Sequence, residues 1–233
     1  EALSTAVLEE EERESGCALI NFGASTTTLG IYREGSLRKL IVSPLGGKSI
    51  TRDIMELGIS EEHAEKIKCL RGSALVSMVD NPVFIQIPSV IPDTKPVKIS
   101  TEFLATIIEA RLDEITQPLF SAIKNYPEKL EGGIIITGGG TRMKNIIEYI
   151  NERTDTYARE GHHTDWLNDT SNPIFLDPIL SQLAGTILLN DEYRKLHPKV
   201  EKKIKEPKIP KKGIKERITK SLFNFFGDDN DMN

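Results

Sequence analysis

Residues 17–32 read Cys-Ala-Leu-Ile-Asn-Phe-Gly-Ala-Ser-Thr-Thr-Thr-Leu-Gly-Ile-Tyr, and residues 134–141 read Ile-Ile-Ile-Thr-Gly-Gly-Gly-Thr. The first stretch predicts a buried strand at 17–20, a turn of small residues at 21–28 and a returning strand at 29–32. The second predicts a buried strand that ends in three glycines. Such loops can offer backbone N–H groups and hydroxyls to phosphate oxygens. Each loop alone is equally well explained as a tight turn, but together they predict a ligand cleft.

The surrounding sequence alternates between strand and helix patterns, which predicts an α/β protein. Further strands are expected at 37–42 and 83–90. Helices are expected at 49–57, 60–67, 101–123 and 178–189, with apolar residues at helical spacing that include Phe103. Small residues in the last helix, Ala184 and Gly185, predict a close packing contact. Residues 1–14 read as the end of a helix from a missing upstream lobe.

The composition excludes several classes of protein. The chain has 233 residues, of which 38% are hydrophobic, and this is too apolar for a disordered chain. No apolar run approaches the roughly 18 residues that span a bilayer, and the acidic start predicts no secretory signal. The two cysteines, Cys17 and Cys69, are expected to be buried thiols in the cytosol. The pair His162 and His163 does not have the pattern of a metal site, and none is predicted.

The net charge of −5 divides unevenly along the chain. Residues 194–220 carry twelve Lys or Arg and three Glu, a charge of +9, so the remainder carries −14. On a helix, the apolar residues of the tail share one face and basic residues flank them, which predicts an amphipathic helix on an anionic membrane. This set is Ile214, Lys215, Arg217, Ile218, Lys220, Leu222, Phe223, Phe225 and Phe226. The alternative is a terminal helix that packs on the body.

Several stretches together resemble the C-terminal half of the FtsA family, the actin-like cell-division proteins. The hairpin 21–26 is similar to the second phosphate hairpin of the actin, Hsp70 and sugar-kinase superfamily, and 135–141 to its adenosine loop. The segments 44–54, 65–68, 72–75 and 107–112 resemble FtsA in particular. The resemblance covers roughly residues 1–193, and the tail repeats the family's architecture.

The resemblance implies an actin-like, ribonuclease H-like lobe. Its sheet subdomain would comprise 15–50 and 130–193, with an inserted upper subdomain at 51–129. A basic disordered linker would follow at 194–212, then a membrane-targeting helix at 213–227 and an acidic end at 228–233.

The resemblance also implies the functional residues. A nucleotide would contact Asn21, Gly23, Ala24, Ser25, Thr26, Glu65, Lys68, Gly138, Gly139, Gly140 and Thr141. Arg111 would receive the acidic C-terminal peptide of FtsZ. Glu65 and Lys68 could equally form a surface ion pair, and Arg111 could equally be a solvated helix residue. Asp53 is expected to cap or pair locally.

The implied function is an ATP-binding scaffold that tethers the FtsZ ring to the cytoplasmic face of the inner membrane. It would self-associate into filaments, help to recruit later division proteins and bind no nucleic acid. ATP with Mg²⁺ would bind the full-length protein, and weakly or not at all this chain alone. Asn21 replaces the usual hairpin carboxylate, so at most a weak ATPase is expected. The alternatives are a scaffold of pilus or secretion assembly and a sugar or phosphate kinase of the same superfamily.

Overall fold

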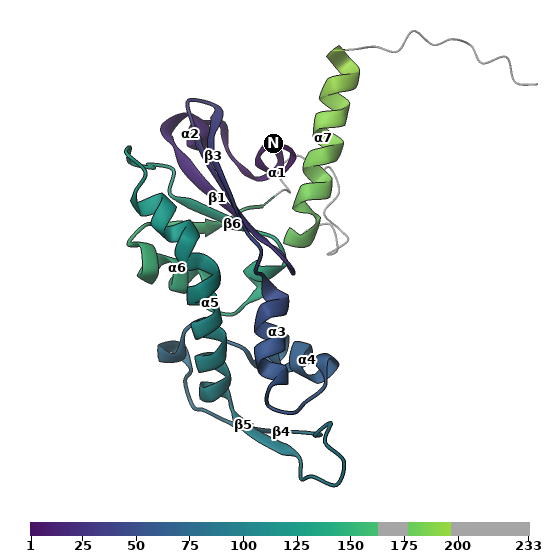
Figure 1. Cartoon of the computed structure of the whole chain (residues 1–233). Coiled ribbons are helices and arrows are strands. Elements are labelled where there is room, and N and C mark those ends of the chain that lie inside the picture. The colour runs from purple at the N-terminus through teal and green to yellow at the C-terminus, as the bar shows by residue number, and fades with distance from the viewer. Residues whose placement is uncertain (163–176, 197–233) are drawn as a thin grey trace, which may run out of the picture. The chain divides into compact units, whose positions relative to one another are not determined.

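The computed structural model describes residues 1–162 and 177–196 (Figure 1). Its centre is a five-stranded sheet in the order β3-β2-β1-β6-β7. The strands are β1 (Cys17–Phe22), β2 (Thr27–Arg33), β3 (Ser36–Ser43), β6 (Ile134–Thr137) and β7 (Ala158–Glu160). The first three strands pair antiparallel, while β6 pairs parallel with both β1 and β7. The two-residue turn at Glu34 and Gly35 has positive φ at both positions, as a tight hairpin requires.

The helices are α1 (Ala2–Val7), α2 (Glu10–Ser15), α3 (Gly47–Met55), α4 (Glu61–Arg71), α5 (Thr101–Lys124), α6 (Ile146–Thr154) and α7 (Ser181–Leu196). Three-residue and four-residue 3₁₀ turns lie at η1 (Val76–Met78), η2 (Gly139–Arg142) and η4 (Pro178–Leu180). A separate two-stranded sheet pairs β4 (Phe84–Ile87) with β5 (Val97–Ser100). Ser60 and Ser100 are the N-caps of α4 and α5, because their hydroxyls accept hydrogen bonds from the backbone N–H groups of His63 and Phe103.

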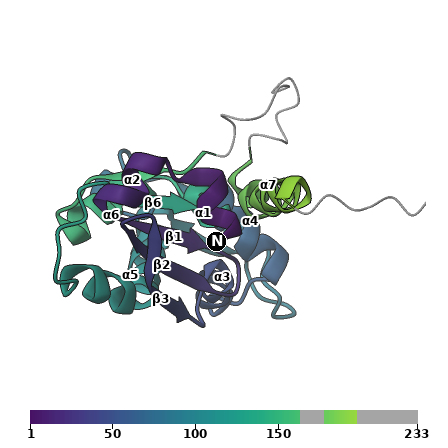
Figure 2. The ribbon, with the colours of Figure 1, turned by 90° about the horizontal axis from the view of Figure 1, so that it is seen from above.

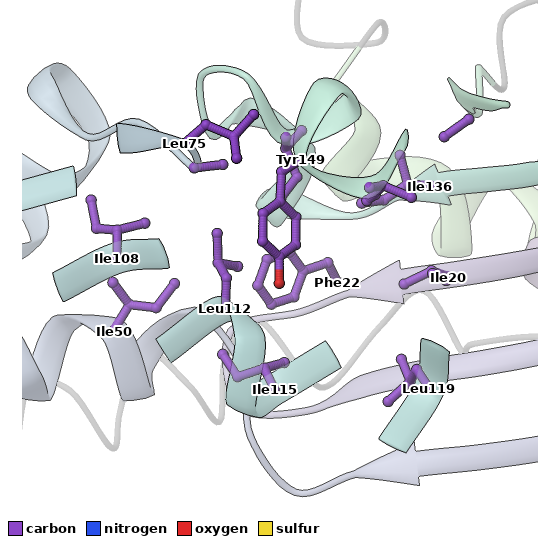
Figure 3. Packing of buried hydrophobic residues seen from close by; sticks show 14 of the residues in the cluster. Ile20, Phe22, Ile50, Leu75, Ile108, Leu112, Ile115, Leu119, Ile136 and Tyr149 are labelled. Atoms are coloured by element: carbon purple, nitrogen blue, oxygen red, sulfur yellow. The ribbon is translucent and has the colours of Figure 1, made fainter. Parts of the chain in front are cut away.

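Each face of the five-stranded sheet is covered by helices. On one face Leu29 and Ile31 of β2 join a large core with Ile115 and Leu119 of α5. Figure 3 shows how side chains from β1, β6, α5 and α6 meet in this core. On the other face a smaller cluster includes Cys17, Leu19, Tyr32 and Ile135 of the sheet and Ala6, Val7 and Leu8 of the N-terminal segment.

The predicted close contact in the last helix is present. A Cβ atom on Gly185 would lie 1.7 Å from the carbonyl oxygen of Ala2, so α7 and the start of α1 touch through backbone. Figure 2 shows the two helices side by side. Glycine at this position therefore allows the N-terminal segment to pack between α7 and the sheet.

Several predicted boundaries were wrong. Residues 1–14 form two short helices, because the chain is extended at Leu8. The first turn is limited to 23–26, since β1 and β2 are longer than predicted, and α3 begins two residues before the predicted start. The strand predicted at 83–90 spans only β4, while β5 and β7 were not predicted. Phe103 is 51% exposed and does not belong to the apolar face of α5.

The large core is continuous through the expected upper subdomain. It joins Ile50 and Ile54 of α3, Leu104 and Ile108 of α5, and the sheet residues. The subdivision at 51–129 remains a prediction.

The last helix reaches Leu196, so the first three residues of the predicted linker are helical. The rest of the linker, the predicted membrane helix and the acidic end lie outside the described residues. Within residues 1–162 and 177–196, no helix is long and apolar enough to cross a bilayer.

Candidate functional site

The two glycine-containing loops meet because β1 and β6 are parallel. Asn21 at the end of β1 lies opposite Thr137 at the end of β6, so both following loops leave the same edge of the sheet. A Cβ atom on Gly138 would lie 2.6 Å from Asn21 Oδ1, and Gly138 has a φ of 88° that favours glycine. The sequence prediction that these loops form one site is thus supported by their geometry.

The hairpin tip is attached to the first turn of α3. The backbone N–H groups of Gly47 and Lys48 donate to the carbonyl oxygens of Gly23 and Ala24, at 3.0 and 2.7 Å. These N–H groups have no partner within their own helix, so the hairpin satisfies them. A Cβ atom on Gly46 would lie 2.6 and 2.8 Å from the same two carbonyl oxygens. Glycine at 46 is therefore needed for this close approach.

A cleft of about 670 Å³ opens where these elements meet. This volume is within the range of roughly 300–1,000 Å³ that is usual for small-molecule sites. Its lining includes nine of the residues predicted to contact nucleotide: Asn21, Gly23, Ala24, Thr26, Glu65, Lys68, Gly138, Gly139 and Gly140. The other two do not line it. Ser25 is exposed at the hairpin tip, and Thr141 closes the glycine loop through a hydrogen bond from its hydroxyl to the Gly138 carbonyl at 2.9 Å.

The cleft also contains residues that the sequence did not indicate, among them Lys48, Glu61, Arg142, Ile179 and Gln182. Ile179 and Gln182 come from η4 and the start of α7, about forty residues beyond the glycine loop. Arg142 forms an ion pair with Asp177 across the same distance in sequence. No local motif marks Ile179 and Gln182, because only the packing of η4 and α7 brings them to the cleft.

Glu65 and Lys68 form the i,i+3 ion pair that their spacing allows, but only Glu65 is exposed at the surface. Lys68 is only 8% exposed, and its Nζ lies 2.7 Å from Glu65 Oε2. Burial alone would raise the pKa of Glu65, but hydrogen bonds from Lys68 and Thr51 and the charge of Lys68 lower it below its ordinary value. Glu65 is therefore an ionised acceptor on the wall of the cleft.

The predicted partner residue Arg111 lies on α5, away from the cleft lining. Its guanidinium binds Asp53 of α3 and Glu114 of its own helix. The local pairing expected for Asp53 is therefore present, with a partner on another helix. Arg111 is 26% exposed and paired with carboxylates, so it is neither a solvated helix residue nor an unoccupied cation for an acidic peptide.

Of the two cysteines predicted to be buried, Cys17 is buried and Cys69 is not. Cys17 is fully buried, and burial, with a smaller effect from the charge of Glu12, raises its pKa to about 12. Cys69 is exposed and lines the cleft, so the expectation of two buried thiols was wrong for it. Its thiol donates to Glu65 Oε1 at 3.5 Å, because both residues lie on the same side of α4, one turn apart.

A larger hollow of about 1140 Å³ lies at the C-terminal end of α5, between that helix and the segment 152–157. Its walls are mostly polar and charged side chains, and neither glycine loop borders it. We assign the candidate site to the smaller cleft, because two backbone loops and an ionised carboxylate converge there.

Comparison with known proteins agrees with this geometry. The family model for the cell division protein FtsA matches residues 18–178. The FtsA of Pseudomonas aeruginosa is 33% identical over 180 residues, covering 75% of this chain and 43% of that protein. The FtsA of Borreliella burgdorferi is 31% identical over 233 residues, covering 97% of this chain and 53% of that protein. The chain thus spans about half the length of the curated relatives it matches.

Solved structures show the same fold. MreB5 of Spiroplasma citri bound to ADP has a TM-score of 0.68 at 21% identity, over 84% of this chain and 59% of that one. The MamK double helical filament has a TM-score of 0.61 at 13% identity, over 82% of this chain and 57% of that one. At these identities the likeness concerns the fold alone. On the family match and the two sequence relatives, the chain belongs to the FtsA family of cell division proteins, and its fold is actin-like.

Proposed function

We propose that this chain is part of an ATP-binding, actin-like scaffold that tethers the FtsZ ring to the cytoplasmic membrane and helps to recruit the division machinery. The observation that carries the proposal is the cleft between the hairpin 23–26 and the glycine loop 138–140, in a chain of the FtsA family. The likeness to MreB5, whose structure holds ADP, supports a nucleotide as its occupant.

The phosphates of ATP would lie at the hairpin tip, near Gly23 and Thr26, where small residues allow close approach. The adenosine would lie against Gly139, whose missing side chain leaves the wall flat. Glu65 would accept a hydrogen bond from a donor group of the nucleoside.

The chemistry of the cleft supports binding more than hydrolysis. Asn21 carries an amide at the end of β1, which can orient a ligand but cannot take a proton from water. Mg²⁺, when bound with ATP, would neutralise phosphate charge. In the described residues no three His, Cys, Asp or Glu side chains cluster to hold a metal, so the phosphates would supply most of its ligands. We therefore infer a weak ATPase at most.

Nucleotide binding is tested by titrating the chain with a fluorescent ATP analogue and with ATP by NMR. Because the chain spans about half the length of its relatives, we expect affinity weaker than micromolar, with shifts confined to residues that line the cleft. Micromolar affinity would contradict the weak binding, and shifts elsewhere would contradict the site.

The FtsZ contact is proposed on α5. Phe103 and Arg111 are separated by two helical turns and lie on the same side of the helix, and Phe103 is half exposed. An acidic peptide could pack an apolar side chain on Phe103 and place a carboxylate at Arg111, in competition with Asp53 and Glu114. Co-sedimentation with FtsZ tests this contact, and the discriminating variant is described in the Discussion.

Attachment to the membrane is proposed through the tail, which lies outside the described residues. Its support is the sequence pattern, in which Ile214, Ile218 and Leu222 share one helical face beside basic residues. We expect the chain to pellet with anionic liposomes, less so as salt rises. Deletion of residues 213–233, or the change of Phe225 and Phe226 to Glu, should release it. Equal pelleting of the intact and truncated chains would contradict the tether.

Self-association into filaments is supported by the likeness to MamK, whose solved structure is a double helical filament. Together with the tail, this supports the proposal that the protein acts at the division site, as a peripheral protein on the cytoplasmic face of the inner membrane. Sedimentation of the chain with and without ATP tests the self-association.

A further inference from the structure

A buried hydroxyl lies beside the nucleotide cleft and contacts three of the groups that form it. Thr51 on α3 is 2% exposed. Its Oγ1 lies 3.1 Å from the Gly47 carbonyl oxygen, 2.5 Å from Glu65 Oε2 and 2.9 Å from Lys68 Nζ. Thr51 does not itself line the cleft, so any effect on a ligand must pass through these neighbours.

The Lys68 ammonium is fully used within this cluster. It has three N–H donors, and it contacts three acceptors: the Gly47 carbonyl oxygen at 3.1 Å, Thr51 Oγ1 at 2.9 Å and Glu65 Oε2 at 2.7 Å. A phosphate would have to displace one of these buried contacts to reach it. Lys68 therefore joins Gly47, Thr51 and Glu65, and all three of its N–H donors are used within the protein.

The single proton of Thr51 has one preferred acceptor. Lys68 already donates to the Gly47 carbonyl and to the Thr51 oxygen, so the Thr51 proton goes to Glu65 Oε2, which is charged and nearer. Oε2 thus accepts two hydrogen bonds. Among residues 1–162 and 177–196, the other carboxylate oxygen, Oε1, has only the Cys69 thiol at 3.5 Å, and the Glu65 side chain is 49% exposed. Oε1 is the oxygen that can accept from a ligand.

The same cluster reaches the hairpin. The Gly47 carbonyl is held by Lys68, while the Gly47 N–H donates to the Gly23 carbonyl at 3.0 Å. Gly47 therefore contacts the carboxylate cluster through its carbonyl oxygen and the hairpin tip through its N–H group.

We propose that Thr51 is a positioning residue of the nucleotide site: it orients Glu65 so that Oε1 receives a hydroxyl of the nucleoside, and with Lys68 it ties this recognition to the first turn of α3 and the hairpin. The inference rests on the proposed nucleotide site and adds which residue orients its acceptor. The ligand group is a hydrogen-bond donor, because an ionised carboxylate only accepts.

The test compares Thr51→Val, which replaces the hydroxyl by a methyl group of similar size, with Thr51→Ser, which keeps the hydroxyl. The first readout is the pH titration of the Glu65 carboxyl carbon by NMR in the full chain without nucleotide. Loss of the Thr51 donor should raise the pKa of Glu65 in Thr51→Val, while Thr51→Ser should titrate as the unchanged chain does. A role in packing alone would not separate the two variants in this way.

The second readout is the ratio of affinities for ATP and 2′,3′-dideoxy-ATP, measured by NMR titration. The unchanged chain should prefer ATP by about 5- to 10-fold, the factor of one net hydrogen bond. Thr51→Val should lose most of this preference, and Thr51→Ser should restore it. If Thr51→Val does not fold, Thr51→Ala removes the same hydroxyl without adding a methyl group to the cluster.

An unchanged Glu65 titration and an unchanged ATP preference in a folded Thr51→Val or Thr51→Ala chain would overturn the inference. If the unchanged chain binds neither nucleotide, the proposed weak binding of ATP by this chain alone fails. The Glu65 titration still decides in that case whether Thr51 positions the carboxylate.

Discussion

Arg111 of α5 binds Asp53 of α3 through two hydrogen bonds, from Nε to Oδ2 at 2.5 Å and from Nη2 to Oδ1 at 2.6 Å. The two side chains are 26% and 27% exposed, so water screens the pair only in part. Such a two-point contact between a guanidinium and a carboxylate is geometrically specific. It joins two helices whose contacting residues are 58 positions apart, and one of them, α3, is the helix whose first turn anchors the hairpin.

Removal of this pair should destabilise the fold. Arg111→Ala is expected to lower the free energy of unfolding by about 1–2 kcal/mol. Arg111→Glu should cost more, because the new carboxylate would face both Asp53 and Glu114. Urea unfolding measures the change, with Arg71→Ala on the exposed face of α4 as the control. Equal stability of Arg111→Ala and the unchanged chain would show that the pair contributes little.

The proposed FtsZ contact predicts that removing the charge of Asp53, the partner of Arg111, strengthens the binding of the FtsZ peptide. Asp53→Asn removes one of the two carboxylates that occupy Arg111, so an acidic peptide should bind several-fold more tightly. Fluorescence anisotropy with the C-terminal peptide of FtsZ measures this. A double variant, Asp53→Asn with Arg111→Gln, should lose the gain. Unchanged affinity in Asp53→Asn would place the peptide elsewhere on the protein.

Two adjacent glycines of the cleft should respond differently to substitution. In the part of the chain that the structure describes, a Cβ atom on Gly139 would meet only Ile179, at 3.4 Å or more, so Gly139→Leu should fold and fill the adenosine wall. A Cβ atom on Gly140 would lie 2.0 Å from Phe22 Cδ1, so Gly140→Ala should disturb the core. We expect Gly139→Leu to abolish ATP shifts with little change in melting temperature, and Gly140→Ala to lower that temperature. Retained ATP binding in Gly139→Leu would move the nucleoside away from this loop.

The two thiols should differ in reactivity. Cys17 is buried and its pKa is raised to about 12, so almost no thiolate forms at pH 8. Cys69 is exposed, although burial of part of its side chain and the charge of Glu65 raise its pKa. Iodoacetamide at pH 8 should therefore modify Cys69 alone, and both residues in denaturant, as read by mass spectrometry. Bound ATP should slow the modification of Cys69, and no slowing at saturating ATP would argue against its place in the cleft.

Stability at acid pH should report the Glu65 cluster. The pKa of Glu65 is lowered from 4.5, so its contacts stabilise the folded chain fully above pH 4.5. This contribution is lost as the pH falls through the lowered pKa, because protonation removes the negative charge of Glu65 that Lys68 and Thr51 stabilise. Glu65→Gln should therefore be less stable than the unchanged chain at pH 7, with the difference shrinking at low pH. A difference that does not depend on pH would exclude the carboxylate charge as its cause.

Features that depend on neighbours along the chain could be predicted from the sequence. The hairpin 17–32 and the strand before Gly138 could be predicted because their apolar runs are bounded by small residues with special turn geometry. Ser60 and Ser100 could be predicted as caps, since a cap and the N–H it serves are three residues apart. The two loops could be assigned to one cleft because both offer small residues and backbone N–H groups after a buried strand, whereas the parallel pairing of β1 and β6 that brings them together was not predicted.

Which side chains are buried or paired at the candidate sites depends on contacts that form only when the chain packs. Lys68 has the spacing of an exposed ion pair with Glu65, yet α3 covers it and supplies Thr51 and the Gly47 carbonyl. Arg111 has the position of a solvated helix residue, yet Asp53 occupies it. The short strands β5 and β7 are stabilised by their partners and carry too few residues for a periodic signal. In each case the deciding contact joins residues far apart in sequence, and their free energy of interaction exists only after the chain has packed.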